Sequence, residues 1–225
     1  DILRREDISD ENSVLLRFKQ HIDRMKRGAV QGAVLVDCRM AGESAETKNF
    51  EEFIAISKIL RSHQDESYLI ATSSEEFDNS IRDGRWVGIL CYEGLRAANG
   101  NLLWLKKLYK EAGLRIAMLT HNDSNEFATG AADPNGNPAS KNPLGLTEAG
   151  QKAVELMNEM GILIDLSHAS PMTRRDVLSY SKKPVMLSHT SSAEVYDNGR
   201  NLSDKDIREI AEHGGLIGCM TSPAA

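Results

Sequence analysis

Two stretches decide the fold of this chain, Ile162-Leu163-Ile164-Asp165-Leu166-Ser167-His168 and Pro184-Val185-Met186-Leu187-Ser188-His189. Each contains a short apolar run, which is typical of a buried strand, and each ends in polar residues. Between them, Ser170-Pro171 opens a predicted helix, because serine caps helix N-termini and proline is favoured at the first helical position. Strand, helix and strand at this spacing predict two parallel strands joined by a helical crossover.

The same alternation extends outward in both directions. Further apolar runs predict strands over 29–37, 86–91, 114–119 and 215–219, and residues 68–71 form another short apolar run. Apolar residues at helical spacing predict helices before Gly28, over 50–60, before Gly113, from the cap Thr147 to Gly161, and after the cap Ser203. Residues 122–146 form the only long irregular stretch, and a loop of that length is usually functional.

This pattern indicates an α/β fold with a parallel sheet, and the short apolar strands indicate burial on both faces. Two architectures fit, an open doubly wound sheet and a (β/α)8 TIM-type barrel. About six of the predicted strands are of the barrel type, whereas a closed barrel has eight strands and typically about 250 residues. If the chain is a barrel, we expect one incomplete domain over residues 1–225, without the first and last strands.

Composition excludes several classes of protein. The chain has 27 Lys and Arg against 33 Asp and Glu, and this net charge of −6 argues against a dedicated nucleic-acid binder. No apolar run approaches the roughly 18 residues of a membrane helix, and no signal peptide is visible. The 3 cysteines form neither a zinc pair nor a disulfide framework, so a reducing, cytoplasmic location is expected.

Polar side chains follow four of the predicted strands. Glu93, His121, His168 and His189 each stand at the carboxyl end of a strand, where sites are built in α/β sheets and barrels. Carboxylate and neutral imidazole suit a zinc ion, and a catalytic zinc keeps one position open for water. A single histidine at a strand end is more often a hydrogen-bonded structural residue, so a metal site and a structural role both remain open.

Longer motifs around these residues make the sequence resemble the membrane (renal) dipeptidase family of metallopeptidases, in the amidohydrolase superfamily. The resemblance rests on the stretches 164–170 and 184–191, on Leu119-Thr120-His121-Asn122, on Tyr92-Glu93-Gly94, and on Gly199-Arg200-Asn201-Leu202-Ser203-Asp204. The opening Asp1-Ile2-Leu3 is similar to the end of the family's His-x-Asp motif. The resemblance covers essentially the whole chain and is strongest over 86–219.

The resemblance implies a (β/α)8 barrel that hydrolyses dipeptides with two zinc ions bridged by a carboxylate. By position, Glu93 would be the bridge, and His168 with His189 would complete one metal site. Asp1 would belong to the other, His121 would face the tetrahedral intermediate as a catalytic and substrate-binding residue, and Arg200 would bind the substrate carboxylate. Manganese, cobalt or iron could replace zinc at such ligands. The implied partner is a dipeptide, and a homodimer is left open.

The chain also departs from the family's pattern. The family's first metal-binding histidine is absent, its catalytic aspartate follows an eighth strand that this chain does not reach, and Leu95 replaces a second glycine after Gly94. We therefore expect an internal fragment of a longer enzyme that does not hydrolyse dipeptides alone. The alternatives are another amidohydrolase-type activity, on lactones, β-lactams or N-acyl amino acids, and a truncated homologue that binds without catalysis.

Overall fold

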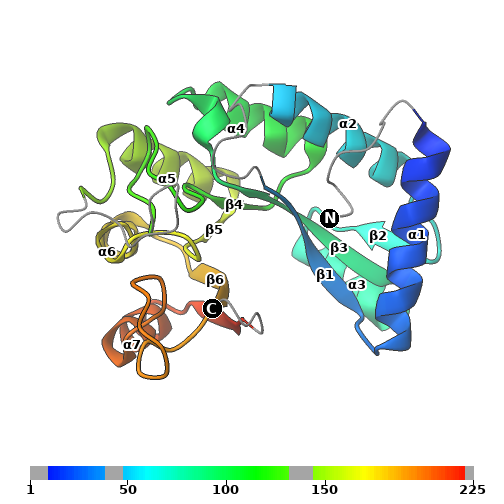
Figure 1. Cartoon of the computed structure of the whole chain (residues 1–225). Coiled ribbons are helices and arrows are strands. Elements are labelled where there is room, and N and C mark those ends of the chain that lie inside the picture. Colours follow the sequence, from blue (N-terminus) through cyan, green and yellow to red (C-terminus); the bar gives the residue numbers. More distant parts are fainter. Residues whose placement is uncertain (1–9, 39–47, 132–143, 221–225) are drawn as a thin grey trace. The chain divides into compact units, whose positions relative to one another are not determined.

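The computed structural model describes residues 10–38, 48–131 and 144–220 of the chain (Figure 1). It divides into two compact units. The first comprises Asp1–Asp37, Glu46–Tyr92 and Leu103–Arg115, and the second comprises Cys38–Ala45, Glu93–Leu102 and Ile116–Ala225. Within the described residues, no helix is long and apolar enough to cross a membrane. Whether residues 1–225 form a single domain stays a prediction.

The first unit is built around three strands, β1 (Gly32–Cys38), β2 (Tyr68–Ile70) and β3 (Trp86–Glu93). β2 pairs in parallel with β3, with Tyr68 opposite Trp86, and β3 lies between β2 and β1. Gly32 lies so close to β3 that an added Cβ would stand 2.5 Å from the carbonyl oxygen of Val87. The last residue of β3, Glu93, belongs to the second unit.

Aromatic side chains form the core of the first unit. Helix α1 (Glu11–Arg27) buries Val14, Phe18 and Ile22 along one face, and the Phe18 ring packs edge-on against Tyr68 and Trp86 with centroids 5.0 and 6.0 Å apart. A second cluster joins helix α2 (Lys48–Ser62) to β3 through contacts of Phe50 and Phe53 with Tyr92. Helix α3 (Ser74–Arg82) begins in an acidic turn that contains Glu75 and Glu76, and Ser73 caps it.

The second unit contains a parallel sheet in the order β4 (Ile116–Met118), β5 (Leu163–Asp165), β6 (Val185–Thr190) and β7 (Leu216–Cys219). Each strand lies beside the next one along the chain, which is the order of a barrel and not of a doubly wound sheet. The chain is therefore the mixed α/β protein with parallel strands that the sequence predicts, consistent with an incomplete TIM-type barrel.

Helices α5 (Glu148–Met160), α6 (Pro171–Tyr180) and α7 (Asp204–Glu212) connect these strands, and α5 packs against α6 (Figure 1). Their N-termini are capped as the sequence predicts, by the hydroxyls of Thr147, Ser170 and Ser203. Gly161 ends α5 with a φ of 71°, a conformation that glycine adopts without strain.

Three predictions about single elements differ from the structure. The strand predicted from residue 29 begins at Gly32, because Ala29 and Val30 close the end of α1 by donating to the carbonyls of Lys26 and Met25. The helix before Gly113 is the short α4 (Leu103–Lys107), continued as a π-helical turn, η2 (Leu108–Ala112). β7 is not buried on both faces, since Leu216 is 66% exposed.

Candidate metal centre

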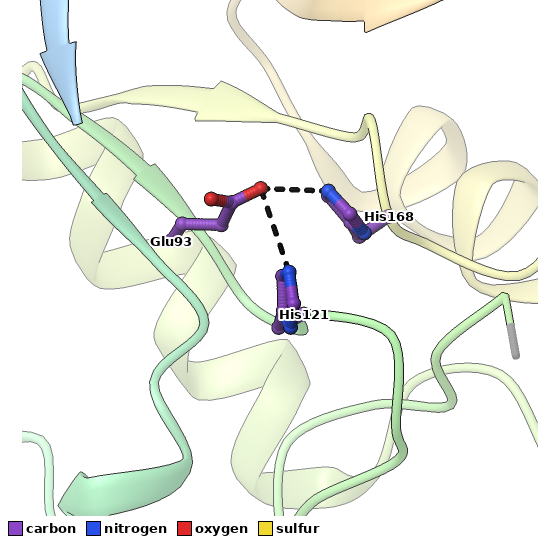
Figure 2. Close-up of side chains that lie close together, drawn as sticks. All are labelled: Glu93, His121 and His168. Carbon is purple, nitrogen blue, oxygen red and sulfur yellow. Dashed lines mark ion pairs between the residues drawn. The ribbon is translucent and has the colours of Figure 1, made fainter. Parts of the chain in front are cut away.

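The predicted site residues come from the ends of four successive strands. Glu93 is the last residue of β3, His121 and His168 follow β4 and β5 by three residues, and His189 lies near the end of β6. All four belong to the second unit. Figure 2 shows the Glu93 carboxylate and the rings of His121 and His168 pointing toward one another. Asp1, which the resemblance also makes a metal ligand, lies outside the described residues.

The imidazole nitrogens converge on one carboxylate oxygen. Glu93 Oε1 lies 2.6 Å from His168 Nε2, 3.4 Å from His189 Nε2 and 3.9 Å from His121 Nε2. Ligand atoms of Glu93, His121 and His168 all lie within 4.8 Å of one another, which is close enough for one ion to reach all three. His189 lies equally near, with its Nε2 2.9 Å from that of His168.

A neighbouring side chain determines which nitrogen of His168 faces the centre. His168 Nδ1 lies 2.8 Å from the amide oxygen of Asn122. Because that oxygen can only accept, Nδ1 carries the proton, and Nε2 presents a lone pair toward Glu93. Histidine ligands of metals are commonly held by such an outer hydrogen bond. The sequence interpretation missed the role of Asn122, although the residue directly follows His121 in a quoted motif.

A carboxylate and imidazole nitrogens this close together favour a cation beside them, and the Arg200 guanidinium lies 3.1 Å from His168 Nε2. Nε2 of His168 meets Nε2 of His189 and Oε1 of Glu93 at distances at which acceptors repel one another. A proton or a metal ion removes the repulsion, and two imidazoles with a carboxylate are a preferred donor set for zinc. The residues present therefore fit the metal that the sequence predicts.

Burial and hydrogen bonding shift the ionisation of these groups. Burial opposes ionisation of Glu93, but its contacts with His168 and His189 outweigh it, so the Glu93 pKa lies well below its usual range. Burial, together with the charge of His168, lowers the pKa of His121 to about 4, and burial also lowers the pKa of His168. At neutral pH Glu93 is therefore a carboxylate, and His121 and His168 are neutral imidazoles, the forms that bind a metal.

The backbone next to the carboxylate is tightly packed. Gly94 has a φ of 87°, and a Cβ at this position would stand 2.8 Å from the backbone nitrogen of His121. Leu95 donates its N–H to the carbonyl of Leu119 at 3.2 Å, and Arg96 forms an ion pair with Asp123. The segment after Glu93 is thus bound to the segment that carries His121.

Arg200 lies at the same centre, in the loop between β6 and α7. Its Nη2 is 3.1 Å from His168 Nε2, and its Nε donates to the carbonyl of Ser167 at 3.4 Å. Burial lowers the pKa of Arg200, but a guanidinium still remains charged at neutral pH. The structure therefore places a fixed positive charge beside Glu93 and the histidines. The resemblance predicts that this charge, on Arg200, binds the carboxylate of the substrate.

A second arginine supports this loop, and the sequence interpretation missed it. Arg174 of α6 is 2% exposed and donates to the carbonyls of Ala169 at 2.9 Å and Arg200 at 3.4 Å. It also faces Asp206 of α7 at 3.7 Å, and Asp206 completes the capping box of that helix. No local motif marks Arg174, because its partners come from three separate segments.

Comparison with known proteins agrees with this geometry. The model of the family described as membrane dipeptidase (peptidase family M19) matches residues 3–225. A curated relative, the dipeptidase aclJ of Aspergillus oryzae, is 37% identical over 134 residues, which are 60% of this chain and 30% of that protein.

Solved structures share the fold. The probable dipeptidase PvdM of Pseudomonas aeruginosa superposes with a TM-score of 0.77 at 23% identity, covering 88% of this chain and 52% of that one. A metallopeptidase of Rhodobacter sphaeroides, liganded with a phosphinate mimic of the dipeptide L-Ala-D-Ala, gives a TM-score of 0.75 at 22% identity, covering 88% and 63%. The chain thus spans less than two thirds of the length of each of these relatives.

Proposed function

Since the chain belongs to the membrane dipeptidase family, peptidase family M19, we propose that it carries the metal-binding part of a zinc enzyme that hydrolyses the peptide bond of dipeptides. One observation supports this most directly. Glu93 Oε1 lies within 3.4 Å of Nε2 of both His168 and His189. The positively charged side chain described beside these atoms is Arg200, whose Nη2 lies 3.1 Å from His168 Nε2.

The proposed centre would hold two zinc ions. Glu93 would be shared by the two sites, His168 and His189 would complete one of them, and Asp1 would belong to the other. Bound there, the two ions would supply a hydroxide at neutral pH and polarise the peptide carbonyl. Another divalent metal with the same preference for imidazole and carboxylate could take their place.

The side chains around the centre bind and orient the dipeptide. Arg200 offers a planar pair of donors to the free carboxylate of the substrate, which favours dipeptides over substrates that lack this group. His121, neutral because its pKa is lowered to about 4, keeps a ring N–H that can donate to the oxygen on which negative charge develops. Its Nδ1 is buried and has no hydrogen-bond partner among the described residues, so that nitrogen is not committed elsewhere.

Zinc binding by the purified chain tests the centre. We expect the chain to bind Zn²⁺ in a calorimetric titration after treatment with chelator, and Glu93→Ala to lower the affinity by at least about 100-fold, since it removes a direct ligand. The matched control is Glu111→Ala, at a glutamate paired with Lys58 on the surface of the first unit. Equal affinity of Glu93→Ala and Glu111→Ala would contradict the proposed centre.

The substrate is tested on the protein in the length that its gene encodes. We expect hydrolysis of a dipeptide with a free carboxylate, and little hydrolysis of the same dipeptide as a C-terminal amide. Arg200→Met should raise KM for the free dipeptide and leave KM for the amide nearly unchanged. Equal turnover of the two substrates would favour the lactone, β-lactam or other amide hydrolyses of the superfamily.

A further inference from the structure

The loop that carries Arg200 has little apolar packing of its own. It joins β6 to α7, and its residues Val195 and Tyr196 are exposed large side chains. Of the side chains that the structure describes in this loop, only those of Asn201 and Leu202 are buried. The place of the Arg200 backbone therefore depends mainly on hydrogen bonds, and segments held in this way open more easily than packed ones.

Hydrogen bonds inside the loop define its shape. The side-chain oxygen of Asn198 accepts the backbone N–H of Arg200 at 3.0 Å and that of Asn201 at 2.9 Å. The side-chain amide of Asn201 donates to the carbonyl of Tyr196 at 2.7 Å. These partners all belong to the loop itself, so they form a turn around Arg200 without joining it to the neighbouring helix.

Arg174 of α6 provides a bond that leads out of the loop. Its Nη1 donates to the carbonyl of Arg200 at 3.4 Å and to the carbonyl of Ala169 at 2.9 Å. Ala169 directly follows His168, and the Nη2 of Arg200 lies 3.1 Å from His168 Nε2. One nitrogen of Arg174 therefore joins the backbone beside His168 to the backbone of Arg200.

Arg174 is itself held in a single place. Its side chain is buried, and its Nη2 faces Asp206 Oδ2 at 3.7 Å. The same oxygen of Asp206 accepts the backbone N–H and the hydroxyl of Ser203 at the start of α7. A guanidinium carries five donors in a rigid plane, so it can face two carbonyls and a carboxylate at once, whereas a lysine ammonium is a compact charge on a flexible stem.

We propose that Arg174 is a positioning residue that holds Arg200 beside the centre, and that selectivity for substrates with a free carboxylate depends on it. Arg174 acts through the backbone of Arg200 and not through the substrate. A guanidinium on a displaced loop keeps its charge, but its two donors no longer align with a carboxylate at this place. The selectivity rests on the proposed function, whereas the positioning of Arg200 does not.

The decisive variant is Arg174→Lys, made in the protein in the length that its gene encodes. Lysine keeps a positive charge beside Asp206, which limits the loss of stability, but it lacks the rigid fork that reaches both carbonyls. One control is Arg175→Lys, the same substitution at the exposed neighbour. The other is Thr173→Val, which removes a buried hydroxyl bonded to the carbonyl of Thr129 at 2.8 Å and so weakens α6 at a different contact.

A second variant changes the partner of Arg174 instead. Asp206→Asn keeps a side-chain oxygen for Ser203 but removes the charge that faces Arg174 Nη2. We expect it to change Arg200 in the same direction as Arg174→Lys, and by less. Because the buried arginine stays in place, this variant tests the proposal even if Arg174→Lys does not fold.

Two measurements report the two parts of the proposal. A ¹H–¹⁵N NMR spectrum of protein with labelled arginine shows the Nε–H of Arg200, which donates to the carbonyl of Ser167, and Arg200→Lys identifies this signal by its loss. We expect this proton to exchange with water at least about 10-fold faster in Arg174→Lys, and at an unchanged rate in both controls. In the dipeptide assay, Arg174→Lys should raise KM for the free dipeptide about 10-fold and leave kcat, and KM for the C-terminal amide, nearly unchanged.

The outcomes separate the positioning of Arg200 from the proposed function. An exchange rate at Arg200 that is unchanged in the folded variants, or that rises equally in Thr173→Val, overturns the proposal. A KM that rises equally for the free dipeptide and its amide also overturns it, because it indicates a general loss of structure. Faster exchange in Arg174→Lys and not in the controls supports the positioning even if the protein hydrolyses neither substrate, a result that would count against the proposed function alone.

Discussion

The two units of the molecule bury different kinds of side chain. The core of the first unit consists of aromatic and aliphatic groups, with Phe18 packed on Tyr68 and Trp86. The second unit buries charged and polar groups, among them Glu93, Asp165 and His168 at its strand ends and Arg174 in helix α6. Burying polar groups costs free energy unless each is hydrogen-bonded, and this cost is tolerated where the groups bind something. The contrast indicates that the first unit serves as scaffold and the second carries the function.

Removing a core ring should give the largest effect. Phe18→Ala should lower the free energy of unfolding by about 4 kcal/mol, because it removes buried area and leaves a cavity beside Trp86. Urea unfolding followed by tryptophan fluorescence reports this unit, since Trp86 and Trp104 both lie in it. The control is Leu16→Ala on the same helix, where the side chain is 60% exposed. A loss no larger than that of Leu16→Ala would contradict the scaffold interpretation.

Removing a buried charge in the second unit should come next. Arg174→Met should lower the free energy of unfolding by about 3 kcal/mol, because Asp206 and the carbonyl of Ala169 lose a buried donor. Its exposed neighbour provides the control Arg175→Met, which should change stability little. Urea unfolding followed by far-UV circular dichroism measures both variants. Equal free energies of unfolding for Arg174→Met and Arg175→Met would mean that the polar contacts of Arg174 contribute nothing measurable to stability.

Lowering the pH should destabilise the chain through a residue of the second unit, His121, without any substitution in the apolar core. The pKa of His121 is lowered to about 4, so below its ordinary value of 6.5 the unfolded chain binds a proton that the folded chain does not. Stability of the metal-free chain should therefore fall as the pH falls from about 6.5 toward 4, by about 2 kcal/mol at pH 5.

The pH dependence is assigned by substitution. His121→Asn should reduce the loss of stability between pH 7 and pH 5, measured by urea unfolding in the presence of chelator. The control His63→Asn replaces a histidine whose side chain is 46% exposed, and it should leave the loss of stability between pH 7 and pH 5 unchanged. Glu93 adds a loss of the same sign at lower pH, since its pKa is also lowered. A pH dependence that His121→Asn does not alter would exclude His121 as its origin.

An exposed ion pair in the first unit should give the smallest effect. Lys58 lies 2.7 Å from Glu111, but the two side chains are 55% and 39% exposed. Lys58→Ala should therefore lower the free energy of unfolding by about 0.5 kcal/mol or less, and added salt should reduce the difference further. Urea unfolding at low and high salt measures it. A loss as large as that of Arg174→Met would show that the contrast between the units does not depend on burial.

Much of the local structure could be predicted because it depends on nearby residues. The caps Thr147, Ser170 and Ser203 were predicted from a side chain and the helix that follows it, and all three are confirmed. The early start predicted for β1 was wrong because apolar character alone does not separate Ala29 and Val30, which close α1, from the strand itself.

The partners of the site residues could not be predicted in the same way. Arg174 donates to Ala169 and Arg200 and faces Asp206, so its role depends on three segments that only the folded chain brings together. Asn122 stands beside a predicted site residue, yet nothing in its own neighbourhood indicates that it bonds to His168.

The sequence by itself determined the alternation of strands and helices, and it placed Glu93, His121, His168 and His189 at strand ends, because periodicity and parallel pairing follow from residue type and spacing. Only the tertiary structure decided which nitrogen of His168 and His189 faces Glu93. That choice depends on contacts such as those of His168 Nδ1 with the amide oxygen of Asn122 and of His189 Nδ1 with Ser188 Oγ, whose lengths are set by atomic positions and not by spacing along the chain.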